Sequence, residues 1–584
     1  MESNEISFKA KPKKKIKYNI DANNKKEIKP PLTSKGNNRK KLPSIRMNNN
    51  LKPIATNRIV RATSVAREKK KDTTPEICNL FLFYKTNHVY LYIPNSKNKN
   101  EIIINNEEDY TILYQISIPA IYKMRFFKYA NMPECLTNAI SLSHMKYKKK
   151  LEHSNIIWRL LHPNEMRTLI RSMSRNQKFN HFPTTYQLGR KDNMYRHYRH
   201  FKSMFNNDYD FAPMTFILPF DTEKFQSEIE SVSTSKHKWI VKPVNLSRGR
   251  GIHLLQDDEE FEKISKASLK LNITQYLVSR YISNPHLINQ TKYDLRIYVL
   301  ITSFNPLRIY LYDNGLVRFA TEKYTKGNYD NVYVHLTNYS INKNNTNYKA
   351  NNNDENGEDD NSSKWSLHEY KEHFDRTRKE NDIDRFSDLW NKIKNIVIKT
   401  IITIKDESMR EVPMNKSTCL FELYGFDIMI DSDFKAWLIE VNVNPSLHCT
   451  SPLDLNIKSD LISDIITIVG VVPYHHKNSE DVYDVGNGKV KEEEVQMKNY
   501  MKIRAKIMKE FNRANLKSKM EEYDDGVYKN MITYCEEERH RASMTTFELI
   551  FPNKATIEKY SKFILKEGIG DGDVVYWQYI LSKQ

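Results

Sequence analysis

The sequence predicts a protein that mixes α/β and α+β structure, with a folded core between two basic flanking segments. Two observations predict the core: a strongly alternating β-hairpin near residues 421–443, and helical repeats of apolar residues every 3.6 positions on both sides of it. The third observation is compositional, because the first 72 residues contain few large apolar side chains. We therefore expect a disordered basic arm, a folded body and a basic helical C-terminal extension.

The N-terminal arm, residues 1–72, carries most of the net charge. It contains 21 Lys and Arg against six Asp and Glu, whereas the whole chain of 584 residues has a net charge of +20. A segment of this composition cannot bury enough apolar surface to fold alone. Its charge suits nucleic acid, a nuclear-import receptor or any acidic polymer, and composition does not choose among them.

Composition also restricts the class of protein. With 39% hydrophobic residues the chain can bury a sizeable core. Its five cysteines are odd in number and show no CxxC spacing, so neither a zinc site nor a disulfide framework is indicated, and a reduced, intracellular protein is expected. No apolar run reaches the length that spans a bilayer, and the N-terminus lacks the apolar core of a signal peptide.

The chain enters the folded body through short predicted strands between residues 73 and 120, which are separated by Asn/Lys-rich turns. Residues 156–174 have helical spacing that is interrupted at Pro163. Arg190 and Lys191 then precede a basic aromatic helix, whose cations either face solvent or face a phosphate group.

Two strands flank a glycine-containing loop in KWIVKPVNLSRGRGIHLL, residues 238–255. The whole chain has only 15 Gly, so Gly249 and Gly251 predict a positive φ or a close backbone approach. Such a loop, with Arg248 and Arg250, either covers phosphates or is a tight hairpin with a basic tip. Lys242 in the preceding strand favours an anionic ligand, because a buried ammonium group is costly without one.

A strand from Val278 to Ile282 is followed by a strand in which three charged residues, Lys292, Asp294 and Arg296, alternate with apolar ones. Alternation places the three charges on one face of the strand. They belong to a surface strand with paired ions or to a polar site. A further strand, Leu307–Ala320, carries Arg318 near its end.

Residues 342–363 form an Asn/Asp-rich insertion, predicted to be a flexible surface loop. Helices are predicted at Leu367–Lys379 and Ile383–Asp406. After the hairpin, a loop leads into a helix with Asp454 in its N-cap region and a stop at Gly470. A further helix, Val490–Met520, is acidic at its start and basic afterwards, and it either faces solvent or binds an acidic surface.

The hairpin brings the acidic chemistry together. Its strands, Phe421–Asp431 and Ala436–Val443, are joined at Ser432-Asp433, and the second is predicted to turn its apolar residues to one face and its polar residues to the other. The apolar set is Trp437, Ile439, Val441 and Val443, and the polar set is Glu440, Asn442 and Asn444. A two- or four-residue turn would add Asp427 to the polar face. Two carboxylates and an amide oxygen form a set that Mg²⁺ accepts, although an ordinary half-buried hairpin would show the same alternation.

Nine segments in order resemble the tubulin tyrosine ligase-like family of ATP-grasp ligases, over roughly Ile121–Val472. They are NHFP with GRKD, WIVKP with SRGRGI, SRYI with a following Pro and LI, KYDLRIYV, IYLYDNGLVRFAT, HLTNYS, FELYGFDIMID, WLIEVNVNPSLH and SPLDLNIK. The form of several is similar to the fourth polyglutamylase branch of that family rather than to the tyrosine ligase itself. The arm and the insertion have no counterpart among these motifs.

The resemblance implies a role for each matching residue. Asp427, Glu440 and Asn442 match the Mg²⁺ ligands. Contacts to ATP are implied for Lys242, Ser247, Arg248, Gly249, Arg250, Gly251, Ile252, Ser279, Arg280, Tyr281, Ile282, Lys292, Asp294, Thr337 and Asn338. The incoming amino acid is implied at Arg318, Ser340, Lys364 and Lys458. Arg296 and Lys191 are implied as catalytic residues whose roles are less defined.

The resemblance also implies an organisation: 1–72 as the arm, 73–225 as N-terminal and central subdomains, 226–475 as the ATP-grasp catalytic domain, and 476–584 as an extension that binds microtubules. The implied activity uses ATP and Mg²⁺ to activate a carboxylate as an acyl phosphate, and joins L-glutamate to a glutamate side chain in the acidic tail of tubulin. A glycine ligase, or a binding protein for microtubules or nucleic acid with an inactive core, are the alternatives. The family is expected in the cytoplasm, on the cytoskeleton and in cilia or basal bodies, as a monomer that binds neither membrane nor nucleic acid.

Overall fold

A computed structural model describes residues 125–471 and 526–583, with gaps, and two short strands that precede them. The gaps are 128, 130–131, 143–144, 175–176, 232–237, 247–248, 256–274, 328, 350–361, 378–383 and 414–415. The predicted arm, the cationic helix and most of the Asn-rich insertion therefore lie outside the described residues. Among the helices that are described, none has the length and apolar character needed to cross a membrane.

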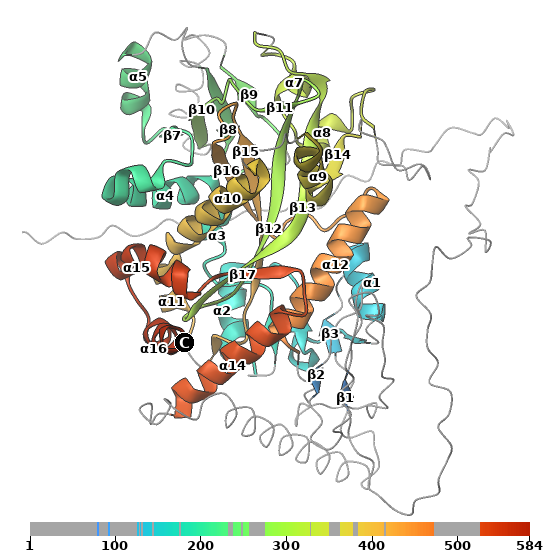
Figure 1. Ribbon diagram of the computed structural model, residues 1–584, viewed down its shortest axis with the longest axis vertical. Helices are drawn as coiled ribbons and strands as arrows, with labels where there is room; N and C mark the ends of the chain where they lie inside the picture. The colour runs from blue at the N-terminus through green and yellow to red at the C-terminus, as the bar shows by residue number, and fades with distance from the viewer. Residues whose placement is uncertain are drawn as a thin grey trace, which may run out of the picture. The chain divides into compact units, whose positions relative to one another are not determined.

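The largest sheet is built on two long strands, β12 (Thr291–Phe304) and β13 (Leu307–Lys323), which pair as an antiparallel hairpin through a turn at Asn305-Pro306. The hairpin β15 (Glu422–Ile430) and β16 (Ala436–Val443) extends it on the β12 side, and β14 (Lys364–Ser366) on the β13 side. Two short strands pair off this path, β11 (Leu287–Ile288) with β12 and β17 (Phe547–Phe551) with β13. Figure 1 shows β12 and β13 running through the described part of the chain.

A smaller antiparallel sheet has its own apolar cluster. Its strand order is β7 (Thr215–Leu218), β10 (Tyr276–Arg280), β8 (Trp239–Pro243) and β9 (His253–Leu254). Helix α5 (Thr222–Ser231) covers it through Phe225, which packs with Trp239 at a ring separation of 5.0 Å. The strands predicted around the glycine-containing loop are thus β8 and β9.

The N-terminal part of the described chain forms a four-stranded parallel sheet in the order β4 (Lys146–Lys148), β3 (Arg125–Phe127), β5 (Ile156–Ile157) and β6 (Lys178–Phe179). Phe179 continues the pairing onto the segment before β15, because its N–H donates to Cys419 O at 2.8 Å and its carbonyl accepts from Phe421 N at 3.0 Å. Of the strands predicted between 73 and 120, the structure describes β1 (Asn79–Leu80) and β2 (Tyr92–Ile93), which pair with each other.

Helices cover the sheets where the apolar periodicity predicts them. The predicted helix at 383–406 is α10 (Arg385–Ile402), which breaks before α11 (Lys405–Glu411), and the helix at 367–379 is α9 (Leu367–Thr377). The helical spacing predicted for 156–174 is confirmed only from Pro163, where α2 (Pro163–Ser172) begins because proline suits the first helical position; the helix expected before Pro163 is wrong, since Ile156–Ile157 form β5. The remaining described helices before α12 are α1 (Glu134–Leu142), η2 (Leu151–His153), α3 (Tyr186–Gly189), α4 (Lys191–Phe205), η3 (Asn206–Tyr209), α7 (Val332–His335) and α8 (Tyr339–Asn342).

Helix α12 (Pro452–Val469) follows the hairpin and begins at an N-cap, Ser451, whose side chain accepts from the N–H of Asp454. Its predicted stop is confirmed, since Gly470 has a φ of 63°. Asn342, the first residue of the predicted insertion, is buried and donates to Leu336 O at 2.7 Å, so the insertion begins within the ordered fold.

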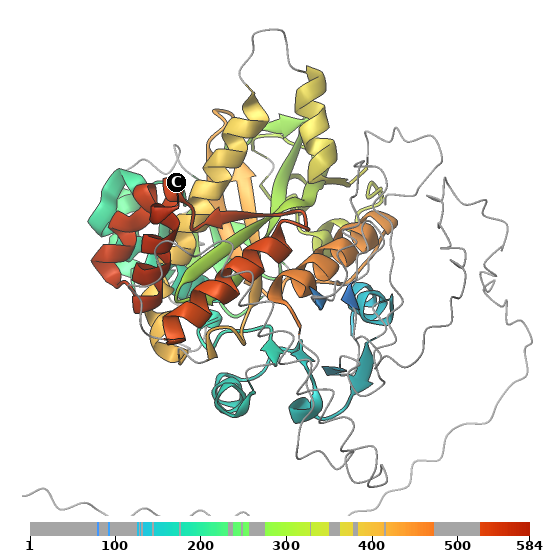
Figure 2. The same cartoon turned by 60° about the horizontal axis from the view of Figure 1, so that its bottom comes forward.

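The C-terminal residues return to the central sheet. Helix α14 (Gly526–Ala542) contacts α12, and α15 (Lys554–Glu567) and α16 (Asp571–Ser582) follow β17. A buried ion pair, Arg308 Nε to Glu538 Oε1 at 2.7 Å, joins β13 to α14. Figure 2 shows these red helices beside the central strands. The predicted domain boundary at 475 lies in residues that the structure does not describe, and the chain after them adds a strand to the sheet of the preceding domain.

Candidate active site

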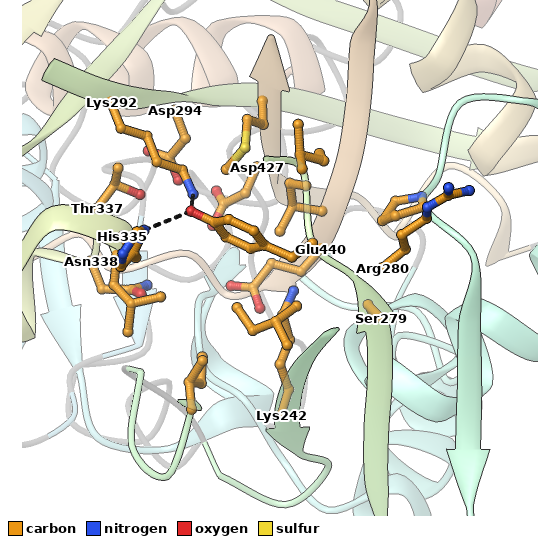
Figure 3. Close-up of a pocket in the computed structure, with 18 residues that line it drawn as sticks. Lys242, Ser279, Arg280, Lys292, Asp294, His335, Thr337, Asn338, Asp427 and Glu440 are labelled. Carbon is orange, nitrogen blue, oxygen red and sulfur yellow. Dashed lines mark hydrogen bonds between the residues drawn. The ribbon is translucent and has the colours of Figure 1, made fainter. Parts of the chain in front are cut away.

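A pocket lies between the small sheet and the central sheet (Figure 3). It encloses about 670 Å³ of space, part of it open to solvent. Twelve residues predicted from the sequence line it: Lys242, Ile252, Ser279, Arg280, Tyr281, Ile282, Lys292, Asp294, Thr337, Asn338, Asp427 and Glu440. Most of the nucleotide residues and two of the three metal residues implied by the motifs are therefore brought to one cavity from both sheets. The described residues that were predicted but do not line it are Asn442, Gly249, Arg250, Gly251, Arg318, Ser340, Lys364, Lys458, Arg296 and Lys191.

The hairpin that carries the acidic residues departs from its predicted turn. Ile430 pairs with Ala436, which leaves five residues in the turn instead of two or four. With an odd number of turn residues and regular pairing, Asp427 would lie opposite Ile439 and share a face with it. A β-bulge beside Asp427 sets one residue of β15 against two of β16, and this shift restores the pairing of Asp427 with Glu440.

Because of the bulge, the predicted division of β16 into an apolar and a polar face is wrong at Ile439. Ile439 was expected on an apolar face opposite Glu440, together with Trp437, Val441 and Val443. Instead Ile439 lines the pocket with Glu440, whereas Leu438 and Val441 are buried in the core. One extra residue therefore converts an apolar position into part of the pocket wall.

The side chains of the three implied metal ligands, Asp427 on β15 and Glu440 and Asn442 on β16, contact one another. Asn442 Nδ2 donates to Glu440 Oε1 at 3.2 Å and to Asp427 Oδ2 at 3.3 Å. Lys191 Nζ lies 3.4 Å from Glu440 Oε2. Two carboxylates and an amide that can turn its oxygen inward form the oxygen-rich donor set that Mg²⁺ prefers, so these side chains fit the implied metal.

Two arginines hold the Asp427 carboxylate. Arg296 donates to both of its oxygens, at 2.6 and 3.1 Å, and Arg318 lies 3.0 Å from Oδ2. Burial would raise the pKa of Asp427, but the charges of Arg296 and Arg318 hold it well below its usual range. The carboxylate is therefore ionised and available to a cation at any physiological pH.

The three cations implied for the amino acid lie on neighbouring elements. Arg318 on β13 pairs in register with Lys364 on β14, and Arg318 also binds Asp294 at 2.8 and 2.5 Å. Lys364 Nζ and Lys458 Nζ both contact the Asp454 carboxylate, at 2.8 and 3.0 Å. The charges of these two lysines outweigh burial and hold the pKa of Asp454 below its usual range. Ser340, the fourth predicted residue, lies on α8.

The glycine-containing loop needs its glycines, as predicted. Gly249 and Gly251 have φ values of 73° and 68°. A Cβ on Gly249 would also lie 2.5 Å from Ile341 Cδ1 and 3.2 Å from Asn338 Oδ1. The loop thus approaches the segment that carries Thr337 and Asn338. Arg250 is exposed, and Ser247 and Arg248 lie outside the described residues.

Lys292 is fully buried against an aromatic ring. Its Nζ donates to Tyr281 OH at 3.0 Å and lies 4.4 Å from the Tyr281 ring centroid, and the same hydroxyl is hydrogen-bonded to His335 Nδ1 at 2.9 Å (Figure 3). Burial lowers the pKa of Lys292 to about 7, although Asp294 opposes the shift. Burial also lowers the pKa of Lys242, which Glu440 opposes. The pocket therefore holds two buried lysines whose pKa values burial lowers, and an anion beside them would raise those pKa values again.

We expect nucleotide binding to draw protons into this pocket at pH 8. Lys292 is largely neutral there, and a phosphate group beside it would return its pKa toward the usual value of about 10.4, so protons are taken up between those two pKa values. Calorimetric titration with a non-hydrolysable ATP analogue in two buffers of different ionisation enthalpy measures the uptake. The parent should show a buffer-dependent enthalpy that Lys292→Met reduces, and equal enthalpies in both buffers would contradict the expectation.

Lys191 reaches Glu440 because α3 lies directly on β16. A Cβ added to Gly189, the last residue of α3, would lie 2.7 Å from both Cγ atoms of Val443, one residue from Asn442. The preceding loop is anchored by the buried Glu422 carboxylate, which accepts from Phe182 N at 3.1 Å and from the Thr185 hydroxyl. The NHFP and GRKD motifs thus position the start of α4 beside the metal residues.

Replacing Gly189 with Ala is expected to lower turnover at this site about tenfold or more, because the added methyl group must push α3 and Lys191 away from β16. The double variant Gly189→Ala/Val443→Ala removes the clash and should recover activity to within about twofold of Val443→Ala alone. Initial rates of the four proteins measure the coupling. A Gly189→Ala protein as active as the parent would show that this close contact does not position Lys191.

Six lining residues were not predicted: Pro213, Ile240, His335, Leu336, Met429 and Ile439. His335 and Leu336 open the HLTNYS motif, from which only the later residues were chosen. Met429 follows Asp427 by two positions on β15, so strand alternation could have found it. The position of Ile439 in the pocket wall depends on the bulge, and the alternation of apolar and polar residues along β16 does not indicate it.

Two sheets that face one pocket, with a glycine-containing loop on the small sheet and paired carboxylates on the large one, form an ATP-grasp fold, as predicted. The profile of the tubulin-tyrosine ligase family matches residues 170–479, more than half of the chain. The chain belongs to the tubulin-tyrosine ligase family.

Curated relatives include tubulin polyglutamylase TTLL5 of Mus musculus, 40% identical over 344 residues, or 56% of this chain and 24% of the relative. Tubulin monoglutamylase TTLL4 of Homo sapiens is 38% identical over 357 residues, or 60% and 28%. Tubulin polyglutamylase ttll-4 of Caenorhabditis elegans is 34% identical over 408 residues, or 67% and 62%. The chain spans about a quarter of the length of the first two relatives.

Proposed function

We propose that the chain is an ATP-dependent ligase that adds L-glutamate to glutamate side chains in the acidic tail of tubulin. The observation that carries the proposal is a group of three cations on neighbouring elements: Arg318, which contacts the Asp427 carboxylate at the pocket, its register partner Lys364, and Lys458, which shares the Asp454 carboxylate with Lys364. None of the three lines the pocket itself, and cations for an acidic amino acid beside a pocket for a nucleotide and a metal suit a ligase that activates one carboxylate and then couples it to an amine.

The nucleotide and metal implied by the family would supply a phosphoryl group that turns a poorly electrophilic carboxylate into an acyl phosphate, and charge stabilisation for its transfer. We assign Asp427, Glu440 and Asn442 to the metal, and Lys242 and Lys292 to the phosphates. Arg296 orients the Asp427 carboxylate through two hydrogen bonds, and Lys191 balances the charge of Glu440. Arg296 and Lys191 are held in place by these contacts before the ligand arrives, which lowers the reorganisation needed in the transition state.

The amino-acid donor is assigned from charge. Lys364 and Lys458 are buried and both contact the Asp454 carboxylate. The side-chain carboxylate of glutamate would add a second anion beside these two ammonium groups, whereas glycine has no second carboxylate to offer. The names of the relatives also favour glutamate over glycine, and they include both a monoglutamylase and polyglutamylases. The proposal therefore covers both the addition of a first glutamate and the extension of a glutamate chain.

The acceptor is assigned from the names of the relatives, which are tubulin-modifying enzymes, and from the net charge of +20, which suits an acidic tail. With tubulin as the acceptor, the place of action would be microtubules in the cytoplasm. The cationic helix predicted around Met501–Lys519 would add to this attraction, and it lies outside the described residues.

The experiment that tests the proposal measures phosphate release from ATP with tubulin and one added amino acid at a time. Glutamate should stimulate release at least tenfold over glycine or tyrosine, and Lys458→Met should raise the KM for glutamate without a similar effect on the KM for ATP. Stimulation by glycine instead would assign the chain as a glycine ligase. No stimulation by any amino acid, with tubulin binding retained, would leave a binding protein.

A further inference from the structure

Two thiols from distant parts of the chain meet at one carbonyl group. Cys135 on α1 donates from Sγ to Leu447 O at 3.3 Å, and Cys449 donates to the same oxygen at 3.5 Å. Cys135 is fully buried, whereas Cys449 is partly exposed in the loop between β16 and α12. The two sulfur atoms are therefore neighbours, with one of them within reach of small solutes.

The surroundings of this pair favour a thiolate on the accessible residue. Once Cys449 is ionised, the Cys135 S–H can turn from Leu447 O to its sulfur, and this hydrogen bond lowers the pKa of Cys449; burial opposes the shift, and the nearby Lys458 ammonium adds to the lowering. The same hydrogen bond and burial raise the pKa of Cys135. A lowered pKa on an exposed thiol and a second thiol in contact are the features of an oxidisable pair.

The pair lies beside the cations assigned to the amino acid. Residue 449 stands between His448, whose carbonyl accepts from Lys458 Nζ at 2.7 Å, and Thr450, whose hydroxyl donates to Asp454 at 2.7 Å. Lys364 Nζ donates to Thr450 Oγ1 at 3.0 Å. A movement of the backbone at residue 449 is thus passed directly to both lysines.

We propose that Cys135 and Cys449 are a redox-sensitive dithiol whose disulfide displaces Lys364 and Lys458, the lysines assigned to the amino acid, and switches ligation off; the second half of this statement rests on the proposed function. A peroxide is the oxidant. The Cys449 thiolate attacks its O–O bond, which gives Cys449 sulfenic acid and, with one proton, water. The Cys135 thiol then attacks that sulfur and releases a second water, so two thiols lose two electrons and two protons and one peroxide becomes two waters.

The disulfide has a geometric consequence. Its S–S bond is about 2.05 Å long, so Cys449 Sγ must leave Leu447 O and move toward α1. Helix α1, α12 and Leu447 are held in one apolar cluster, against which Cys449 packs, so we expect the more exposed backbone of residues 448–450 to be the part that moves. The contacts of His448 with Lys458 and of Thr450 with Lys364 are the first to be lost.

Two other cysteines are internal controls. Cys419 and Cys535 are buried, and burial raises the pKa of Cys535 to about 12 despite the nearby Arg308. Both should resist peroxide and alkylation in the folded protein. Cys78 lies outside the described residues, so the experiment uses the full chain with Cys78→Ser as its parent.

The test treats this parent, and its Cys135→Ser and Cys449→Ser variants, with hydrogen peroxide and maps peptides by mass spectrometry without reduction. We expect a Cys135–Cys449 disulfide in most of the parent protein, at least a tenfold fall in glutamate ligation, and recovery with dithiothreitol. Cys449→Ser should keep its activity to within about twofold in peroxide. Cys135→Ser should lose activity without recovery, because Cys449 then oxidises beyond sulfenic acid.

Absence of the disulfide peptide would overturn the dithiol, and a complete disulfide with unchanged ligation would overturn the switch. Peptide mapping needs no activity, so it gives the first result even if the proposed ligation fails. Cys419 and Cys535 modified as fast as Cys449 would indicate general unfolding by peroxide and would also overturn the assignment.

Discussion

Replacing Glu440 with Gln is expected to lower ATP-dependent ligation by about a hundredfold to a thousandfold while the protein still folds. The substitution keeps the shape of the side chain but removes one of the two negative charges that face each other across β15 and β16. It also removes the anionic partner of Lys191, which lies 3.4 Å away. A metal held by two carboxylates would be held by one.

Glu548→Gln is the matched control, because this glutamate on β17 is half exposed and pairs with Lys394 far from the pocket residues. Rates should be measured over a range of Mg²⁺ concentrations, and Glu440→Gln should require more Mg²⁺ to reach its lower maximum. Equal rates in Glu440→Gln and Glu548→Gln would refute the assignment of Glu440 to the metal.

The second large effect concerns stability. Glu538→Gln is expected to lower the free energy of unfolding by about 3–5 kcal/mol, because Arg308 would keep its charge in a buried site without an anionic partner. Arg308 is 2% exposed and Glu538 is fully buried. The carboxylate also accepts from Thr302 Oγ1 at 2.6 Å and Tyr310 OH at 2.8 Å, so one substitution disturbs three hydrogen-bond partners.

Thermal unfolding of the full chain measures this loss as a midpoint lower by several degrees. Glu558→Gln, an exposed glutamate on α15, should leave the midpoint unchanged. The double variant Arg308→Met/Glu538→Leu removes both charges and should recover much of the loss, as buried ion pairs often tolerate joint apolar replacement. If Glu538→Gln unfolds at the same temperature as Glu558→Gln, α14 is not a structural part of the central sheet.

Much of the site was predictable because strand alternation and glycine usage act locally. The face of β12 that carries Lys292 and Asp294 follows from a two-residue period, and the positive φ of Gly249 and Gly251 follows from their scarcity in the chain. The pairing of Asp427 with Glu440 was predicted for a different reason from the one found. A single bulge residue decides it, and the hydrophobic pattern alone does not show where a strand gains one residue.

Long-range partners were not predictable. Arg308 and Glu538 are separated by 230 residues, and the strand β17 comes from the short apolar run FELIF, which fits a strand or a buried helix equally well. Asp454 was expected near a helix start, which it is, and its contact with Lys458 is a local i,i+4 pair on α12, but its contact with Lys364 depends on how α12 packs beside β14. Such contacts are set by tertiary packing, for which one sequence carries no direct signal.

The most direct test of the proposed ligation is mass spectrometry of tubulin after incubation with the purified chain, Mg²⁺-ATP and an equimolar mixture of glutamate, glycine and tyrosine. We expect added masses of one or more glutamates on a glutamate side chain of an acidic tail, absent in Glu440→Gln and present in Glu548→Gln. Glycine or tyrosine adducts, or no adduct from a chain that binds tubulin and nucleotide, would contradict it.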